Sequence, residues 1–553
     1  MFEQAERDHL QSHQKMGSWK EVALNTISNG TQILDCMWIY VYKYTKRGRL
    51  VKCKARLVVR GDQERRNTQD TYAATLAGRS FRSLMAIAAR FDLELIQYDA
   101  VNAFVNANLD DGIYMPLYGL RKSPLLWHRE LTNTLKKIGF KTVPHEPCCL
   151  TLDGIFVFFY VDDIVFAFRK EDGLRAKALT DQLRSKYELT GGNDLQWFLG
   201  IEIIRNRDRR LIWLSQASYI EKIGRLANKR RIFNTPMGTE ELLPFEGIAT
   251  NGEVNSYQVK ADLSCMHPQH QDAADRAICY LVERKNLALR LGGGDDFEVA
   301  SDSSFADNST DRKSSQAYAM KLFGGLIGWR ANKQDTVTTS TTEAELLALS
   351  QTAKESIYMS RLIDELGVKL DASHIRIQCD NNQTIRLVNA EIAALKTKVR
   401  HVNIHNHWLR QEVANGTIEV TYTPSAELMA DGLTKALQGP HFEAFVKQMG
   451  LEDVTSLLAG RSLPKQMTKN SKNRYMRCGT RKIRNDQRRN HEEGAMSRER
   501  IYRHDTRPGR DDVPARKNNS HTQWLWTIWA DHWQLPSRCE LSWEGVLDPV
   551  ESG

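Results

Sequence analysis

The stretch Gly154-Ile-Phe-Val-Phe-Phe-Tyr-Val-Asp-Asp-Ile-Val-Phe-Ala-Phe168 places two adjacent carboxylates, Asp162 and Asp163, inside an apolar run. Burying unpaired charge costs several kcal/mol, so two acids normally interrupt such a run. The flanking residues predict strands at 155–160 and 164–168, with both aspartates at the tight turn between them. A hairpin tip of this kind suits a divalent metal, but a solvated turn explains the pattern equally well.

A third carboxylate, Asp99, follows an alternating apolar segment at 93–98. The alternation predicts a strand that delivers Asp99 to its carboxyl end. One carboxylate from a strand and two from a neighbouring hairpin can hold two Mg²⁺ ions about 4 Å apart, which is the geometry for in-line phosphoryl transfer. The sequence therefore predicts a two-metal site built from Asp99, Asp162 and Asp163.

Five motifs occur in a specific order: Lys54-Ala-Arg-Leu-Val-Val-Arg-Gly61, Gln97-Tyr-Asp-Ala-Val-Asn-Ala-Phe104, Leu117-Tyr-Gly-Leu-Arg-Lys-Ser-Pro124, Tyr160-Val-Asp-Asp163 and Phe198-Leu-Gly200. In this order they resemble the reverse transcriptase of copia-type long-terminal-repeat retrotransposons. The resemblance implies a fingers–palm–thumb RNA-directed DNA polymerase. It implies that Asp99, Asp162 and Asp163 are the metal ligands. Of the three, Asp163 is the least expected to coordinate the metal directly.

The resemblance also implies three nucleotide-binding residues. Phe104 would lie under the sugar of the incoming dNTP, where its ring would exclude a ribose 2′-hydroxyl. Arg56 would contact the triphosphate, a role suited to a planar, permanently charged guanidinium. Gly119 would bring the backbone close to the nucleotide. Without Asp99 nearby, Phe104 would be better explained as a core aromatic, and Arg56 by itself is explained equally well as a solvated strand residue.

The second half of the chain shows acids at the ends of predicted elements. The predicted strands are 297–302, 316–323 and 326–331 (the last two joined by Gly324-Gly325), then 375–380 and 417–423. A capping box at Ser340 opens a helix to about residue 366, and Ser425 is predicted to cap a helix that carries Asp431. With Asp302, Glu345 and Asp380, this order resembles the ribonuclease H fold. There four acids and two Mg²⁺ hydrolyse the RNA strand of an RNA–DNA hybrid.

Two acids compete for the place on this helix. Glu343 and Glu345 are two residues apart and point in different directions around the helix. Glu343 lies three residues after Ser340, so capping accounts for it. Glu345, followed by Leu346-Leu347-Ala348, better matches the Glu-Leu-x-Ala pattern of the family and is the preferred metal ligand.

Positive charge is concentrated near the C-terminus. Residues 461–517 hold 18 Lys/Arg and 7 Asp/Glu, a surplus of 11 that exceeds the net charge of +9 for the 553-residue chain. This tail is poor in apolar residues and is predicted to be disordered. It could hold nucleic acid non-specifically through phosphates, or it could be simply a solvated tail.

Two parts of the family pattern are missing. Only Pro116 separates Met115 from Leu117, where related enzymes carry a turn and a basic strand, and a second gap follows 257–260. Each gap removes apolar residues and could cost more than the marginal stability of a domain. The alternative function is therefore a catalytically decayed transposon remnant with at most non-specific nucleic-acid binding.

The expected fold class is mixed α/β, a fingers–palm–thumb reverse transcriptase followed by a ribonuclease H-like domain. The expected boundaries are a lead-in at 1–30, reverse transcriptase at 31–225, a connection at 226–296, the ribonuclease H-like domain at 297–436, a family extension at 437–459 and the tail at 460–553. Expected partners are an RNA template, a DNA primer, RNA–DNA hybrid and dNTPs, with two Mg²⁺ per active site. Nine cysteines without a paired framework, and no secretory or membrane-spanning segment, favour an intracellular location, cytoplasmic or nuclear.

Overall fold

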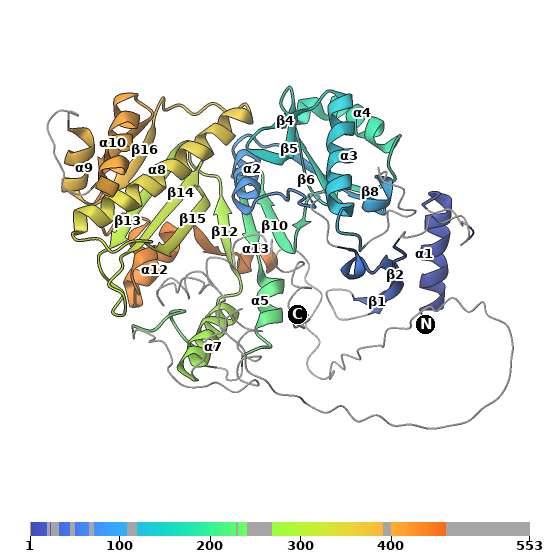
Figure 1. Cartoon of the computed structure of the whole chain (residues 1–553), viewed down its shortest axis with the longest axis horizontal. Helices are drawn as coiled ribbons and strands as arrows, with labels where there is room; N and C mark the ends of the chain where they lie inside the picture. The colour runs from blue at the N-terminus through green and yellow to red at the C-terminus, as the bar shows by residue number, and fades with distance from the viewer. Residues whose placement is uncertain are drawn as a thin grey trace. The chain divides into compact units, whose positions relative to one another are not determined.

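The computed structural model describes residues 2–18, 23, 32–44, 50–65, 71–107, 119–227, 231–239, 268–390 and 400–459 (Figure 1). The chain is mixed α/β and divides into two compact units. The first unit holds the described residues of Met1–Tyr72 and Phe104–Trp127. The second holds those of Ala73–Ala103 and His128–Thr468.

The first unit is built on one antiparallel strand pair. Strands β1 (Cys36–Tyr44) and β2 (Leu50–Val59) pair along their length, and helix α1 (Glu3–Lys15) packs against β2. The short helices η2 (Gly61–Gln63) and η3 (Ala103–Asn106) follow later in the chain.

Sheet B, the largest sheet of the second unit, has six antiparallel strands in the order β4-β5-β6-β7-β3-β8. They are β3 (Glu94–Ala100), β4 (Lys141–Val143), β5 (Glu146–Leu152), β6 (Ile155–Tyr160), β7 (Asp163–Phe168) and β8 (Leu189–Asp194). Helices α3 (Ser123–Ile138) and α4 (Gly173–Arg184) accompany it. The apolar run of the sequence forms β6 and β7, whose side chains are buried from Ile155 to Phe159 and from Ile164 to Phe168. Because both faces of this hairpin are covered, its strands are apolar throughout instead of alternating.

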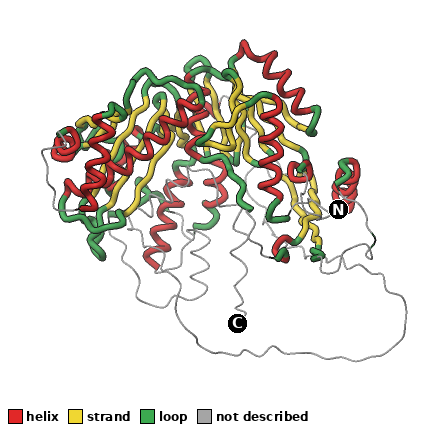
Figure 2. Tube along the Cα trace, turned by 45° about the horizontal axis from the view of Figure 1, so that its top comes forward, coloured by secondary structure: helices red, strands yellow, loops and turns green. Residues whose placement is uncertain are grey.

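Sheet D has the strand order β15-β14-β13-β16-β17. Its strands are β13 (Phe297–Ser304), β14 (Ser315–Leu322), β15 (Gly325–Lys333), β16 (Ile375–Cys379) and β17 (Ile418–Tyr422). The first three are antiparallel, while β16 and β17 run parallel to β13. Helix α8 (Thr341–Glu365) lies across the sheet against β13, β14 and β16, and α9 (Asn382–Asn389) and α10 (Arg400–Ala414) pack on α8 (Figure 1; Figure 2).

Two predicted local features of this region are wrong. The hairpin turn between β14 and β15 consists of Phe323 and Gly324, both with positive φ, and Gly325 already pairs with Leu322. Ser425 does not cap a helix, because helix α11 (Asp431–Thr434) starts only at Asp431. The Ser425 hydroxyl instead donates to Asp380.

Sheet C joins segments that are far apart in the sequence. Its order is β18-β12-β11-β10-β9, formed by β9 (Trp197–Phe198), β10 (Ile201–Asn206), β11 (Leu211–Ser215), β12 (Leu287–Leu291) and β18 (Leu451–Asp453). Helix α12 (Gly439–Gln448) contacts β18, and α13 (Thr455–Ala459) packs against the buried side chains of the sheet through Leu457 and Leu458. Helices α5 (Ala217–Ile223) and α7 (Pro268–Glu283) contact each other. The C-terminal segment after α11 therefore returns to pair with β12.

Helix α2 (Gly78–Arg90) connects the sheets of the second unit. Its middle residues are all buried, and it contacts β11, β12, β14 and β15. Phe81 stacks on Phe198 with ring centroids 4.9 Å apart. The Arg82 Nε donates to the carbonyl of Ile327 at 2.7 Å, and burial lowers the pKa of this guanidinium to about 9. An arginine held in the core fixes α2 to the edge of sheet D.

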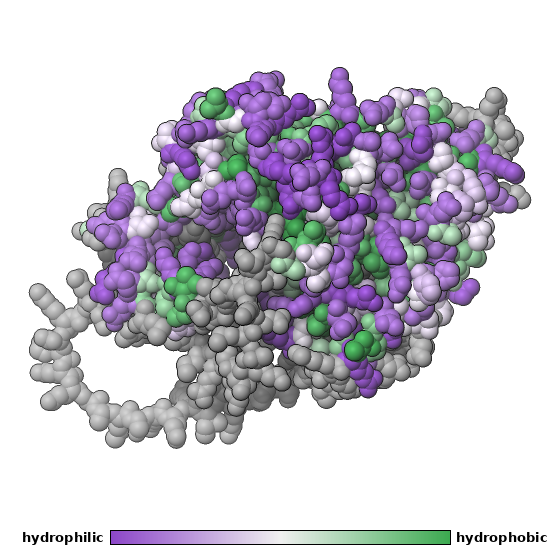
Figure 3. All heavy atoms as spheres, turned by 180° about the vertical axis from the view of Figure 1, so that it is seen from behind, coloured by the Kyte–Doolittle hydropathy of each residue, from purple (hydrophilic) through white to green (hydrophobic). Residues whose placement is uncertain are grey.

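Among the described residues, no helix combines the length and apolar character needed to cross a bilayer. The face drawn in Figure 3 shows hydrophobic residues scattered among hydrophilic ones.

Candidate catalytic sites

The first candidate site lies at the tip of the β6–β7 hairpin. Tyr160 pairs with Asp163, so the turn contains only Val161 and Asp162, and Asp163 is the first residue of β7. The prediction that both aspartates lie in the turn is thus wrong by one residue. Val161 has φ +55°, a left-handed conformation that is costly for a β-branched residue. Backbone strain of this kind concentrates at functional sites.

Strand β3 brings Asp99 to the same tip. Asp99 is the direct cross-strand partner of Asp163, so the two side chains share one face of sheet B. The backbone nitrogen of Ala100 donates to the carbonyl of Asp162 at 2.9 Å, which ties the turn to β3. Gln97 Nε2 donates to Asp163 Oδ1 at 2.8 Å, so this carboxylate already has an amide partner. Asp99 is exposed, and Asp162 and Asp163 are half-buried.

The three predicted nucleotide-binding residues lie in the first unit, whereas these aspartates lie in the second. Arg56 is a half-buried residue of β2 opposite Ile39, and Phe104 is half-buried in η3. Gly119 has φ +110°, and a Cβ at this position would lie 2.0 Å from the carbonyl oxygen of Val59. Close backbone packing therefore requires glycine at position 119, whether or not this residue lies near a nucleotide.

The second candidate site, which we call the acidic site, is formed by Asp302 of β13, Glu345 of α8, Asp380 after β16 and Asp431 at the start of α11. Ligand atoms of Asp302, Asp380 and Asp431 all lie within 4.8 Å of one another. A second group with the same spacing contains Glu345, Cys379 and Asp380. In the part of the chain that the structure describes, these are the two groups whose spacing suits a metal ion. Among these described residues, Asp99, Asp162 and Asp163 do not form such a group.

Each carboxylate of the acidic site has a specific protein partner. Thr434 Oγ1 donates to Asp302 Oδ2 at 2.5 Å, and Ser425 Oγ donates to Asp380 Oδ2 at 2.6 Å. The Lys435 ammonium donates to Asp431. The backbone nitrogen of Ser303 donates to Glu345 Oε1 at 3.2 Å. One short segment, residues 425–435, therefore orients three of the four acids.

The remaining oxygen of Glu345 is the unusual atom of the site. Glu345 is only 5% exposed, and its Oε2 is buried without a hydrogen-bond partner. A buried carboxylate oxygen left in this state is costly. A divalent cation between the acids would satisfy it, so the residues present fit a metal of the Mg²⁺ class, which prefers carboxylate oxygens.

Glu343, the alternative acid on the same helix, has a different function. Its Oε2 accepts hydrogen bonds from the backbone nitrogen of Thr339 at 2.6 Å and from Thr339 Oγ1 at 2.8 Å. Its backbone nitrogen donates to the N-cap Ser340 Oγ at 3.2 Å. Glu343 belongs to neither group with metal-ligand spacing, and these contacts account for it as a residue of the helix start.

Burial and neighbouring acids raise the pKa values of two carboxyl groups of the acidic site, Asp302 and Glu345. Burial, with Asp431 and Asp380 nearby, raises the pKa of Asp302 from 3.8 to about 7, against the opposing hydrogen bond from Thr434. Burial and Asp302 raise the pKa of Glu345 from 4.5 to about 8. Both groups bind protons more tightly in the folded than in the unfolded chain. Their contribution to stability is therefore fully present below about pH 4 and is lost as the pH rises through 7 and 8.

Because the stabilising contribution of Asp302 and Glu345 is lost as the pH rises, we predict that the effect of Mg²⁺ on the melting temperature depends on pH. The cation binds the deprotonated carboxylates of the folded chain, so it should stabilise the chain more at pH 8 than at pH 6. We expect the increase in melting temperature on adding Mg²⁺ to be about 1–2 °C larger at pH 8, the shift that about 1 kcal/mol produces in a unit of the size of the second unit. Thermal unfolding followed by circular dichroism measures this increase. Equal increases at both pH values, or an unchanged pH effect in Asp302→Asn, would contradict the assignment.

Sequence reasoning did not single out Cys379, Ser425, Thr434 or Lys435 as site residues. Their side chains contact the acids or lie within the same groups. A signal was present for the last two, because they follow Asp431 in Ala430-Asp-Gly-Leu-Thr-Lys435. Cys379 directly precedes Asp380, but adjacent residues of a strand normally point to opposite faces.

Comparison with known proteins gives one family match and several similar polyproteins. Residues 19–236 match the family model described as reverse transcriptase (RNA-dependent DNA polymerase). The chain is 28% identical over 506 residues to the retrovirus-related Pol polyprotein from transposon TNT 1-94 of Nicotiana tabacum, covering 81% of this chain and 37% of the relative. It is also 28% identical over 476 residues to that from transposon RE1 of Arabidopsis thaliana, covering 76% and 32%. The chain thus spans about a third of the length of these curated relatives.

Solved structures show only distant likeness. The foamy viral protease-reverse transcriptase in complex with RNA/DNA hybrid aligns with a TM-score of 0.37 and 12% identity, over 76% of this chain and 51% of that chain. RNase H1 from Halobacterium salinarum aligns with a TM-score of 0.18 and 11% identity, over 23% and 86%. Scores this low do not establish a shared fold.

Residues 19–236, which match the reverse transcriptase family model, include the paired Asp99 and Asp163 of sheet B. More particularly, the chain is related over most of its length to the Pol polyproteins of plant copia-type retrotransposons.

Proposed function

We propose that this chain is an RNA-directed DNA polymerase that also hydrolyses the RNA strand of RNA–DNA hybrids, as part of a copia-type retrotransposon. The observation that carries the hydrolytic activity is the convergence of Asp302, Glu345, Asp380 and Asp431 at one end of sheet D. The polymerase activity is supported by Asp99 facing Asp163 beside the strained Val161–Asp162 turn, together with the family match over 19–236.

In this proposal sheet B is the palm and the β1–β2 pair belongs to the fingers, with the thumb extending to about residue 225. Asp99 and Asp162 bind the metals, while Asp163, already bonded to Gln97, mainly orients the tip. Arg56 contacts the triphosphate, Phe104 lies under the sugar, and the backbone at Gly119 borders the nucleotide. Residues 297–436 form the nuclease domain, in which the acids hold Mg²⁺ and the 425–435 segment orients them. Bound Mg²⁺ supplies the charge that activates the nucleophile and neutralises the phosphate in both sites.

The competing function is a decayed remnant that at most binds nucleic acid. The two sequence gaps fall within 108–118 and 240–267, and the basic segment 461–517 follows residue 459, so all three lie outside the described residues. What favours an active enzyme is that all seven predicted acids are present and that four of them converge in the acidic site.

Substrate selection tests the polymerase assignment. The full chain should extend a DNA primer on an RNA template with dNTPs and Mg²⁺, and should incorporate NTPs poorly. Replacing Phe104 by Ala should lower the preference for dNTPs over NTPs by about 10–100-fold, because steric discrimination of this kind is worth about 1–3 kcal/mol. The ratio of kcat/KM for dATP and ATP measures it, with the partly exposed Phe305→Ala as the aromatic control. An unchanged ratio in an active Phe104→Ala enzyme would reject this role for Phe104.

A further inference from the structure

A cysteine lies inside the acidic site. Cys379, the last residue of β16, is fully buried, and its Sγ lies within 4.8 Å of carboxylate oxygens of both Glu345 and Asp380. Its sulfur accepts a long hydrogen bond from the backbone nitrogen of Asn381 at 3.5 Å. These contacts place a soft sulfur ligand against two of the four carboxylates proposed to hold Mg²⁺.

A second observation indicates that the group of Glu345, Cys379 and Asp380 has an unsatisfied ligand atom that a cation could bind. Glu345 Oε2 is buried and has no hydrogen-bond partner, although the other oxygen of the same carboxylate is bonded to the backbone of Ser303. Most buried polar oxygens in proteins have a hydrogen-bond partner, so a buried oxygen without one points to a ligand that would bind it. The group offers two oxygens and one sulfur, so a cation there would meet a mixed ligand set.

We propose that Glu345, Cys379 and Asp380 form a binding site for a thiophilic divalent cation of the Zn²⁺ class, and that its occupation inhibits RNA hydrolysis. This inference rests in part on the proposed function, because Glu345 and Asp380 are also ligands of the proposed magnesium site. Three protein ligands leave one position of a tetrahedral zinc site for water. Zinc bonds of about 2.0–2.3 Å to oxygen and sulfur require the ligand atoms to approach one another by about 1 Å.

Ligand chemistry explains why the site distinguishes the two metals. Mg²⁺ prefers oxygen and has little affinity for sulfur, whereas thiolate selects Zn²⁺. Mg²⁺ therefore does not bind the Cys379 sulfur, although this atom lies within 4.8 Å of oxygens of Glu345 and Asp380. A coordinating Zn²⁺ displaces the thiol proton to the buffer and takes up the thiolate. A bound Zn²⁺ would then occupy the carboxylates of Glu345 and Asp380, which would no longer be available to bind Mg²⁺.

The first test measures binding without any reaction. The full chain is titrated with Co²⁺ or Cd²⁺, whose bonds to thiolate give a ligand-to-metal charge-transfer absorption. We expect the wild-type chain to show one more thiolate-bound equivalent than Cys379→Ala or Cys379→Ser. The loss of affinity should be at least about tenfold, since even partners behind the ligands typically change metal affinity by 10–100-fold. Cys279→Ala, which removes another buried thiol, is the matched control and should titrate like the wild type.

The second test measures inhibition. Hybrid hydrolysis at fixed Mg²⁺ is followed with increasing Zn²⁺, and each variant is compared with its own zinc-free rate. The half-inhibitory Zn²⁺ concentration should rise at least about tenfold in the Cys379 variants and stay unchanged in Cys279→Ala. Identical titrations and identical zinc sensitivity in folded Cys379 variants would overturn the inference. A chain that hydrolyses no hybrid but retains the Cys379-dependent absorption would instead refute the proposed nuclease while leaving the zinc site intact.

Discussion

Replacing Asp380 by Asn is expected to reduce hydrolysis of the RNA strand of a hybrid by roughly 10²–10³-fold or more, the loss typical when a charge-stabilising group is removed from an active site. Asp380 is the residue common to both groups with metal-ligand spacing. Asparagine keeps the shape of the side chain, and its amide oxygen can still accept from Ser425. The change therefore removes one negative charge and little else.

The measurement uses the full chain, a hybrid with end-labelled RNA, and Mg²⁺. Glu343→Gln is the matched control, because Glu343 lies on the same helix as Glu345 but bonds to Thr339. We expect Glu343→Gln to retain most of the rate. Comparable losses in both variants would mean that general damage to α8, and not loss of a metal ligand, explains the effect.

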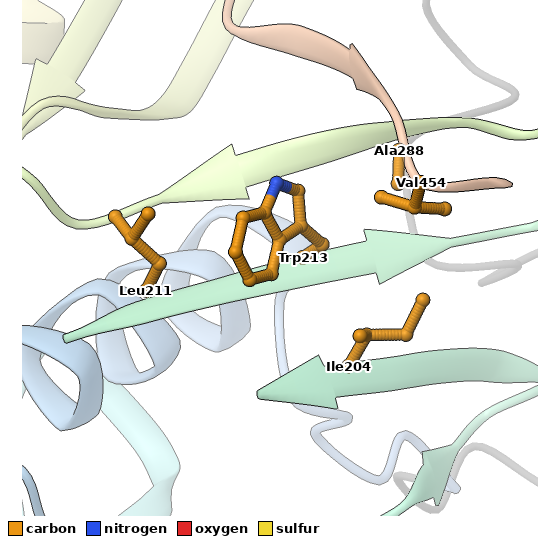
Figure 4. Close-up of a cluster of buried hydrophobic side chains, with 5 residues drawn as sticks. All are labelled: Ile204, Leu211, Trp213, Ala288 and Val454. Carbon is orange, nitrogen blue, oxygen red and sulfur yellow. The ribbon is translucent and has the colours of Figure 1, made fainter. Parts of the chain in front are cut away.

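Replacing Trp213 by Ala is expected to lower the free energy of unfolding by about 3–5 kcal/mol, the usual cost of removing a buried aromatic side chain. Trp213 is 2% exposed and packs among Ile204, Leu211, Ala288 and Val454 (Figure 4). Its Nε1 also donates to Glu452 Oε2 at 2.9 Å. The side chain thus joins β11 to the C-terminal segment that carries β18.

Urea denaturation measures this loss as a lower midpoint at an unchanged slope. Phe305→Ala, which truncates a 40% exposed aromatic, should change the free energy by no more than about 0.5 kcal/mol. A Trp213→Ala loss below about 1 kcal/mol would contradict the packing described for sheet C.

The same packing determines how the proposed nuclease activity can be studied. A fragment beginning at residue 297 would lack β12, the pairing partner of β18, and α2, which carries Arg82 against Ile327. The apolar surface of Val454 would lose its neighbours Ala288 and Trp213. Experiments on RNA hydrolysis therefore belong on the full chain.

Elements with strong local signals could be predicted from the sequence. The apolar run predicted β6 with its observed bounds, because a short run of apolar and aromatic residues that ends at a turn suits a buried strand better than a helix. Ser340 and Glu343 marked the start of α8, where the Ser340 hydroxyl accepts from the Glu343 nitrogen. Asp302 and Asp380 were found at the ends of predicted strands, and Glu345 was found near the start of the predicted helix. The signal used for Asp431 was wrong, because Ser425 does not cap its helix.

What could not be predicted depends on contacts between distant residues. Strand β18 has three residues and no periodicity, and only its pairing with β12, more than 150 residues earlier, makes it a strand. The bonds from Ser425 to Asp380 and from Thr434 to Asp302 likewise join residues far apart in the sequence. Asp163 lies inside β7 because the turn before it has only two residues, Val161 and Asp162. This turn could not be predicted, because valine rarely adopts the left-handed backbone conformation that Val161 has here.

The most direct test of the account is one reaction in which both strands are followed. The full chain is given an RNA template, a labelled DNA primer, dNTPs and Mg²⁺, beside Asp162→Asn/Asp163→Asn and Asp380→Asn. We expect the DNA to lengthen while the RNA is cut. Only the double variant should lose extension, and only Asp380→Asn should lose cutting. A folded wild-type chain that does neither, or variants that lose both activities together, would contradict it.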